Sequence, residues 1–151
     1  MMKIHNMLTL VILAMVLASP VYAGSQPNSS EVESALSSKA SPMKKIAWYK
    51  THPIELDSTI SKHDKAKAYH LLGQEFYQIG DLDQAEEKMR HALNLLEQIN
   101  PAEQEISSIY NDIGLVAIAR KDPIKALALF QAALQKSQDT NNIQTRVTSG
   151  L

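Results

Sequence analysis

The chain has 151 residues, with 15 Lys and Arg against 16 Asp and Glu, so its net charge at pH 7 is −1. This balance gives no sign of the basic surface that nucleic-acid-binding domains carry. The chain contains no cysteine, which excludes disulfide bonds, thiolate metal sites and a cysteine nucleophile.

Residues 1–23 have the organisation of a secretory signal peptide. Lys3 supplies a positive start, and the run from Met7 to Ala18 is apolar except for one threonine. Val21-Tyr22-Ala23 fits the small-x-small rule for cleavage, so we expect cleavage after Ala23 and export to a bacterial periplasm or out of the cell. The alternative is an uncleaved membrane anchor, although a membrane span needs about 20 apolar residues.

Residues 24–41 contain seven serines and few apolar side chains. Such a segment buries too little apolar surface to offset the conformational entropy that it would lose on ordering. We therefore expect a flexible Ser-rich leader, followed by a helical domain over residues 42–151.

A short helix is expected directly after the leader. Ser41 followed by Pro42 is typical of a helix start, and His52-Pro53 would end the helix. Its apolar residues are Met43, Ile46, Ala47 and Trp48. We interpret this helix as the degenerate second half of a repeat that precedes the first complete one and covers its open side.

Residues 60–99 predict two helices joined by a tight turn at Gly80-Asp81. Glycine suits the left-handed conformation that closes a helix. Asp81 is a good N-cap for the second helix, with Gln84 at the capping-box position. Apolar residues at helical spacing would pack the two helices as an antiparallel hairpin; they are Tyr69, Leu72, Gly73 and Phe76 in the first helix and Leu82, Ala85, Met89, Ala92, Leu93 and Leu96 in the second.

The same pattern returns over residues 101–140, as an internal repeat of the first hairpin. Large residues recur at large positions and small residues at small ones. The matched pairs are Tyr69 and Tyr110, Leu72 and Ile113, Gly73 and Gly114, Asp81 and Asp122, Ala85 and Ala126, Met89 and Phe130, Ala92 and Ala133, and Leu93 and Leu134. Internal repeats of this size are typical of solenoids. The expected fold is therefore all-α, with antiparallel helical hairpins stacked as a short α-solenoid of about two repeats plus flanking half-repeats.

Capping residues predict four helix starts, near residues 61, 81, 100 and 122. Asn100 is a suitable cap, Pro101 lies in the first turn, and Glu103 completes a capping box. Lys121-Asp122-Pro123 forms the internal turn of the second hairpin. The register of the repeat also predicts that a third leading helix begins after residues 139–142.

The repeat resembles the tetratricopeptide repeat, whose signature is W-x2-L-G-x2-Y followed by A-x3-F and a proline. The two copies read Tyr69-x2-Leu72-Gly73-x2-Phe76 with Ala85-x3-Met89, and Tyr110-x2-Ile113-Gly114-x2-Ala117 with Ala126-x3-Phe130. The small residues would let two helix backbones approach closely. The resemblance covers roughly residues 60–142. The spacing of 41 exceeds the family's period of about 34 by two helical turns, and the closing proline is absent at Glu97 and Gln138.

The resemblance implies a concave groove that holds an extended or helical peptide and is lined by the first helix of each hairpin. The residues at those positions are Lys67, His70, Gln74, Tyr77 and Gln78 in the first copy and Ser108, Asn111, Leu115, Ile118 and Ala119 in the second. One end of the groove would be polar and the other apolar. The Lys/Asn carboxylate clamp that some relatives use is not matched. The alternative is that these are ordinary surface residues, with Leu115 and Ile118 packed on a neighbouring helix.

The stretch Ile124–Leu134 is apolar at nine of eleven positions. A helix that is apolar almost all round is expected to be buried on both sides, but no complete hairpin follows this one. We expect its outer side to meet another chain, either a second copy or a partner, through Leu127, Phe130 and Leu134. The alternative is that the tail over residues 143–151 folds back and covers it.

No catalytic constellation is visible, and we expect neither an enzyme nor a cofactor. His63 and His70 are seven residues apart and Glu87 and His91 are four apart, which is not the H-E-x-x-H arrangement of a zinc peptidase. Two histidines without a third ligand seldom form a metal site, so no metal is expected either. The charged residues from Glu86 to Arg90 are interpreted as a solvated face.

Together these features predict an exported scaffold or adaptor that binds a protein or peptide partner, or a second copy of itself. No nucleic-acid partner is expected, and contact with the membrane would be transient, through the signal peptide. The alternative function is a structural self-assembly unit without a separate ligand.

Overall fold

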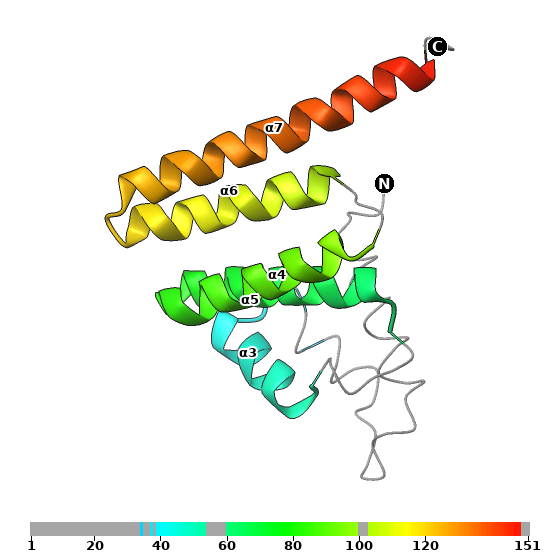
Figure 1. Cartoon of the computed structure of the whole chain (residues 1–151). Helices are drawn as coiled ribbons and strands as arrows, with labels where there is room; N and C mark the ends of the chain where they lie inside the picture. The colour runs from blue at the N-terminus through cyan, green and yellow to red at the C-terminus, as the bar shows by residue number, and fades with distance from the viewer. Residues whose placement is uncertain (1–33, 35–36, 38, 54–59, 100–102, 149–151) are drawn as a thin grey trace. The chain divides into compact units, whose positions relative to one another are not determined.

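A computed structural model describes residues 34, 37, 39–53, 60–99 and 103–148. The helices in these ranges are α3 (Pro42–Thr51), α4 (Lys62–Gln78), α5 (Leu82–Glu97), α6 (Glu103–Ala119) and α7 (Pro123–Thr148) (Figure 1). The described ranges contain no strand, so the predicted all-α class is confirmed. The predicted signal peptide, nearly all of the Ser-rich leader and the cap at Asn100 lie outside these ranges.

The chain divides into two compact units, residues 1–61 and residues 62–151. The first unit contains α3, the short helix that the sequence predicts. Ser41 caps it, because the Lys44 amide donates to the Ser41 hydroxyl at 3.4 Å. At the other end the His52 amide donates to the Trp48 carbonyl, and the His52 ring stacks on the Trp48 ring with centroids 4.4 Å apart.

In the second unit, α4 packs against α5 and α6 packs against α7, so that two helical hairpins follow one another along the chain. Gly80 has a φ of 81° and closes α4. The amides of Gly80 and Asp81 donate to the carbonyls of Tyr77 and Phe76 at 3.0 Å, the pattern of a Schellman motif. The Asp81 carboxylate then accepts from the Gln84 amide at 3.1 Å, as the sequence predicts for an N-cap.

Each of these turn interactions recurs at the matching positions of the second hairpin. Lys121 takes the left-handed position of Gly80, with a φ of 62°. The amides of Lys121 and Asp122 donate to the carbonyls of Ile118 and Ala117 at 2.9 Å. The Asp122 carboxylate accepts from the Lys125 amide at 3.0 Å. The predicted starts near residues 61, 81 and 122 are confirmed, since α4, α5 and α7 begin directly after them.

Glycine lies at a close approach between the two helices of each hairpin. A Cβ on Gly73 would lie 2.7 Å from Cγ of Met89 and 3.1 Å from the Ala85 carbonyl oxygen. A Cβ on Gly114 would lie 2.5 Å from the ring of Phe130. The close approach buries the apolar stripes between the helices. The core residues that are at most 2% exposed and have large side chains are Met89, Leu96, Ile106, Ile109, Ile113 and Val116.

The predicted break at residues 139–142 is wrong. Helix α7 runs without interruption to Thr148, so no third leading helix begins after Asn142. The stretch from Ile124 to Thr148 contains neither glycine nor proline, and Asp, Thr and Asn each lower helix propensity by less than about 0.7 kcal/mol. Residues 143–148 therefore prolong α7 and do not fold back over its first half.

Candidate protein-binding surfaces

Polar side chains join the first helix of one hairpin to the first helix of the next. His63 Nε2 lies 2.7 Å from a carboxylate oxygen of Glu105, and Lys67 Nζ lies 3.5 Å from the other oxygen. Further along the same two helices, His70 Nε2 and Gln74 Nε2 each lie 2.7 Å from Oδ2 of Asp112. Three of the predicted groove residues of α4, Lys67, His70 and Gln74, are thus engaged with α6.

The carboxyl group of Asp112 is 21% exposed. Burial raises its pKa, but the hydrogen bonds from His70 and Gln74 and the charge of His70 outweigh burial, so the pKa of Asp112 lies below its ordinary value. Two donors on α4 therefore stabilise a carboxylate on α6, and this interaction helps to hold the two hairpins together.

We predict that Asp112→Asn lowers the free energy of unfolding at neutral pH by about 1–3 kcal/mol. The substitution removes the negative charge that His70 and Gln74 hydrogen bond, and hydrogen bonds to a charged group contribute more to stability than neutral ones do. A carboxyl group whose pKa is lowered by folding stabilises the protein above its unfolded pKa and loses this effect as the pH falls through its folded pKa. Urea denaturation should therefore show the difference from the wild type shrinking as the pH is lowered from 5 to about 2.

The control is Glu97→Gln, which removes one carboxylate from an exposed position on α5. Its stability relative to the wild type should change little over the same pH range. A difference for Asp112→Asn that stays constant with pH would contradict the role assigned to the carboxylate.

Four residues predicted to line the groove from α6 form an exposed row. Ser108 and Asn111 lie in one half of the helix, and Leu115 and Ile118 follow at 44% and 51% exposure. The fifth predicted position, at the end of the helix, is exposed as well. On α4, Tyr77 is half-buried and Gln78 is exposed. The structure therefore separates the predicted groove residues into an engaged set on α4 and an exposed row on α6.

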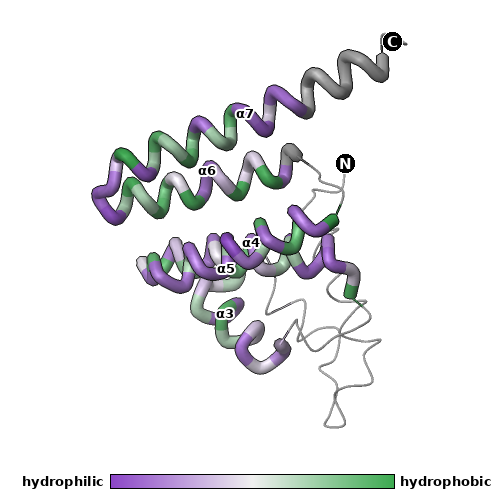
Figure 2. The backbone as a smooth tube through the Cα atoms, in the orientation of Figure 1, coloured by the Kyte–Doolittle hydropathy of each residue, from purple (hydrophilic) through white to green (hydrophobic). Residues whose placement is uncertain are grey.

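Helix α7 carries further exposed apolar side chains. Leu127 and Leu134 are each 59% exposed, and Figure 2 shows apolar residues recurring along α6 and the first half of α7. Phe130, which we grouped with them, lies differently, because it is half-buried with its ring against Gly114 in α6. Ile124, at 83% exposure, belongs to the exposed set instead.

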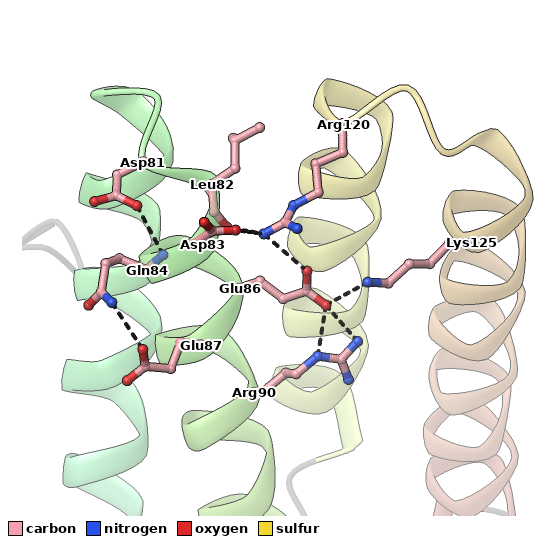
Figure 3. Close-up of polar contacts among 9 residues, drawn as sticks. All are labelled: Asp81, Leu82, Asp83, Gln84, Glu86, Glu87, Arg90, Arg120 and Lys125. Atoms are coloured by element: carbon pink, nitrogen blue, oxygen red, sulfur yellow. Dashed lines mark hydrogen bonds and ion pairs between the residues drawn. The ribbon is translucent and has the colours of Figure 1, made fainter.

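A second polar cluster joins α5 to the second hairpin (Figure 3). Glu86 lies 2.8 Å from both Lys125 and Arg90 and 3.6 Å from Arg120. Arg120 also donates to Asp83 at 2.6 Å. The interpretation of this stretch as a solvated face is wrong for Glu86, whose side chain is only 13% exposed. Helical spacing could not reveal this, because Arg120 and Lys125 come from the other hairpin.

Burial raises the pKa of Glu86, but hydrogen bonds and charges from Lys125 and Arg90 outweigh it, so the pKa of Glu86 lies below its ordinary value. We predict that Glu86→Ala lowers the free energy of unfolding by about 1–3 kcal/mol, because it leaves three cationic side chains without their shared partner. The matched control is Glu87→Ala at the next position, where the side chain is 60% exposed; its effect should stay within about 0.5 kcal/mol. Urea denaturation measures both, and equal effects would contradict the assigned role.

Searches against family models, curated proteins and solved structures gave no match. Within the ranges that the structure describes, no three His, Cys, Asp or Glu side chains gather as a set of metal ligands. The helices in those ranges also include none whose length and apolar character would let it cross a membrane. In the described part of the second hairpin, exposed large apolar side chains lie in the row on α6 and, on α7, at Ile124, Leu127 and Leu134.

Proposed function

We propose that this protein is an exported scaffold of the tetratricopeptide-like kind, which binds segments of other proteins along α6. The observation that carries the proposal is the row of Ser108, Asn111, Leu115 and Ile118, which are all exposed on a helix whose other side is buried. Exposed apolar side chains that lie next to one another and are rimmed by polar residues mark surfaces that bind other proteins.

The repeated geometry of the two hairpins supports the tetratricopeptide-like arrangement. The same turn hydrogen bonds and the same approach of helices at a glycine occur at matching positions of both hairpins. The two leading helices, α4 and α6, contact each other directly through His70 and Asp112. A stack in which leading helices lie side by side would place α4 beside the exposed row of α6 on one surface.

The chemistry of the row indicates what kind of segment it would bind. Leu115 and Ile118 offer apolar contact, while the hydroxyl of Ser108 and the amide of Asn111 can donate to and accept from a peptide backbone. On α4, His70 and Gln74 already hydrogen bond Asp112. A ligand with apolar side chains, bound mainly along α6, fits these properties better than an acidic or basic ligand does.

The test is selection from a displayed library of random peptides against the full chain, followed by titration of the enriched peptides. We expect peptides with apolar residues at a shared spacing, and at least tenfold weaker binding to the double variant Leu115→Ser/Ile118→Ser, since each apolar contact is worth about 1 kcal/mol or more. Ile124→Ser, outside the row, is the control that should bind normally. No enrichment, or equal binding by the double variant, would overturn the proposal.

Export is part of the same proposal and rests on residues 1–23 of the sequence. Expression of the full chain in a bacterial host, followed by N-terminal sequencing of the product, tests it. A product that begins at Gly24 and is found outside the cytoplasm would support export. A product that retains Lys3 would show that the segment is not removed.

The exposed apolar side chains of α7 favour a second candidate function, self-assembly. Ile124, Leu127 and Leu134 are more exposed than Leu115 and Ile118 of the α6 row. They lie outside the set that the resemblance assigns to a peptide groove, so the proposed peptide binding does not account for them.

A further inference from the structure

The first hairpin shows how one hairpin of this chain contacts the next. Three of the residues that join it to the second hairpin are Gln74, which contacts Asp112, Asp83, which contacts Arg120, and Glu86, which contacts both Lys125 and Arg120. These contacts are polar, and their distances run from 2.6 to 3.6 Å. They mark the side of the first hairpin that faces the second.

The repeat gives each of these residues a counterpart in the second hairpin. A shift of 41 places Gln74 on Leu115, Asp83 on Ile124 and Glu86 on Leu127. The three counterparts are 44%, 83% and 59% exposed. At these three positions the second hairpin presents apolar side chains where the first hairpin contacts its neighbour through polar ones. The counterparts of His63, Lys67 and His70, which contact Glu105 and Asp112, are polar: Gln104, Ser108 and Asn111. We call Leu115, Ile124 and Leu127 the trailing face.

The residues of the second hairpin that make these contacts likewise have less polar counterparts in the first hairpin. Asp112, Arg120 and Lys125 of the second hairpin have counterparts at the same repeat positions of the first, which are Leu71, Ile79 and Gln84. Two of these charged residues thus correspond to apolar ones and the third to a neutral amide, while Glu105, the partner of His63 and Lys67, corresponds to another acidic residue, Asp64. Ile79 is 40% exposed and Leu71 is half-buried. We call Leu71, Ile79 and Gln84 the leading face.

We propose that a second copy of this chain docks head to tail, with the leading face of one copy on the trailing face of another. If the two copies meet as the two hairpins of one chain do, the place of the Gln74–Asp112 contact is taken by Leu115 of one copy on Leu71 of the other. The Asp83–Arg120 pair becomes Ile124 on Ile79, and Glu86 with Arg120 becomes Leu127 on Ile79. The ion pairs that Asp83 and Glu86 make with Arg120 within one chain are thus replaced by apolar contacts between the two copies. The Glu86–Lys125 pair is replaced by Leu127 beside the neutral Gln84.

The paired change argues for a second copy over other occupants. A trailing face made for an unrelated partner, or a symmetric dimer of two trailing faces, would explain Leu115, Ile124 and Leu127 and leave Leu71 and Ile79 to α3, the half-repeat expected before the first hairpin. A head-to-tail contact accounts for the apolar residues of both faces at once, and the loss of association in Ile79→Asp distinguishes it from cover by α3. A head-to-tail contact is heterologous, so each copy keeps one face open and assembly can continue beyond two.

The inference rests on the repeat arrangement of the proposed function but not on peptide binding. Because Leu115 belongs to both the α6 row and the trailing face, the test changes only Ile79 and Ile124, which lie outside the row. Full-length protein, as the host processes it, is examined by light scattering from micromolar to submillimolar concentration. We expect the mean mass of the wild type to rise with concentration. Ile79→Asp and Ile124→Asp, each at an exposed position, should associate at least tenfold more weakly, because each places a charge in the apolar contact.

Mixing the two variants gives the decisive result. Ile79→Asp keeps its trailing face and Ile124→Asp keeps its leading face, so an equimolar mixture should form a heterodimer that grows no further. A wild type that stays monomeric throughout would overturn the proposal. So would an Ile79→Asp variant that self-associates like the wild type, which would indicate the symmetric dimer, or a mixture of folded variants that stays monomeric.

Cysteine pairing provides a second test that does not depend on the charged variants. The chain has no cysteine of its own, so Ile79→Cys and Ile124→Cys each introduce a single thiol. Under mild oxidation, a mixture should give the heterologous disulfide in excess over either homodimer, and a mixture with Ser108→Cys in place of Ile124→Cys should not. Equal yields of all pairs would overturn the register. Peptide titration of Ile79→Asp separates the two proposals, because peptide binding should survive when assembly is lost.

Discussion

Gly73→Val is expected to lower the free energy of unfolding by about 3 kcal/mol, at the upper end of the range for overpacked cores. Even a single Cβ at this position would lie 2.7 Å from Cγ of Met89 and 3.1 Å from the carbonyl oxygen of Ala85. The Met89 side chain can move, but the Ala85 carbonyl belongs to the backbone of α5. Valine therefore forces α4 and α5 apart and opens the contact that buries Met89. Urea denaturation followed by far-ultraviolet circular dichroism measures the loss.

Gly114 provides the matched control, because the three atoms nearest to an added Cβ all belong to one side chain. A Cβ there would meet ring atoms of Phe130 at 2.5 to 3.0 Å, with no backbone atom among the three nearest. Shortening that side chain should relieve the clash, so Gly114→Ala/Phe130→Leu should be more stable than the sum of the two single changes implies. Gly73→Ala/Met89→Leu should recover less. A Gly73→Val variant as stable as the wild type would show that α4 and α5 can separate without loss.

Ile113→Ala is expected to lower the free energy of unfolding by about 2–5 kcal/mol, the usual cost of truncating a buried isoleucine. Ile113 is fully buried in α6, which lies between α5 and α7 in contact with both. A cavity at this position loses packing on a helix that belongs to the second hairpin and also contacts the first. Urea denaturation at neutral pH measures the change.

Ile118→Ala is the matched control, since it removes the same atoms from the same helix at a position that is 51% exposed. Its effect on stability should stay within about 0.5 kcal/mol. A large effect of Ile118→Ala would mean that the exposed row is part of the core under solution conditions. Equal and small effects of the two changes would contradict the packing described for α6.

Most of the local structure was predictable because its causes are local. Gly80 and Asp81 fix the first turn through one left-handed residue and one side-chain cap, and both are visible in the sequence. Asp122 repeats the cap in the second hairpin, although Lys121 takes the left-handed position without being glycine. Asp122 and Pro123 predict the turn at this place, because their conformational preferences do not depend on what packs nearby.

The predictions that the structure contradicts concern Glu86, Phe130 and the end of α7. Glu86 was interpreted as solvated and Phe130 as part of an exposed face, because a helical pattern does not reveal which side a second hairpin covers. The break expected after residues 139–142 came from extending the repeat beyond the residues that match it. Asp, Thr and Asn do not end a helix unless a competing turn is more stable, and α7 continues to Thr148.

The sequence by itself determined the helical class, the turns and caps of the two hairpins, and the close approach of helices at Gly73, because these depend on residues near one another in the chain or on a repeat within it. Only the tertiary structure decided which polar groups meet across the hairpins. Asp112 is 42 residues from His70 and Lys125 is 39 residues from Glu86, and such pairs follow from how the helices pack. The exposure of Leu115, Ile118, Ile124 and Leu127 was likewise decided there, because an apolar residue is left in solvent only where no neighbouring helix covers it.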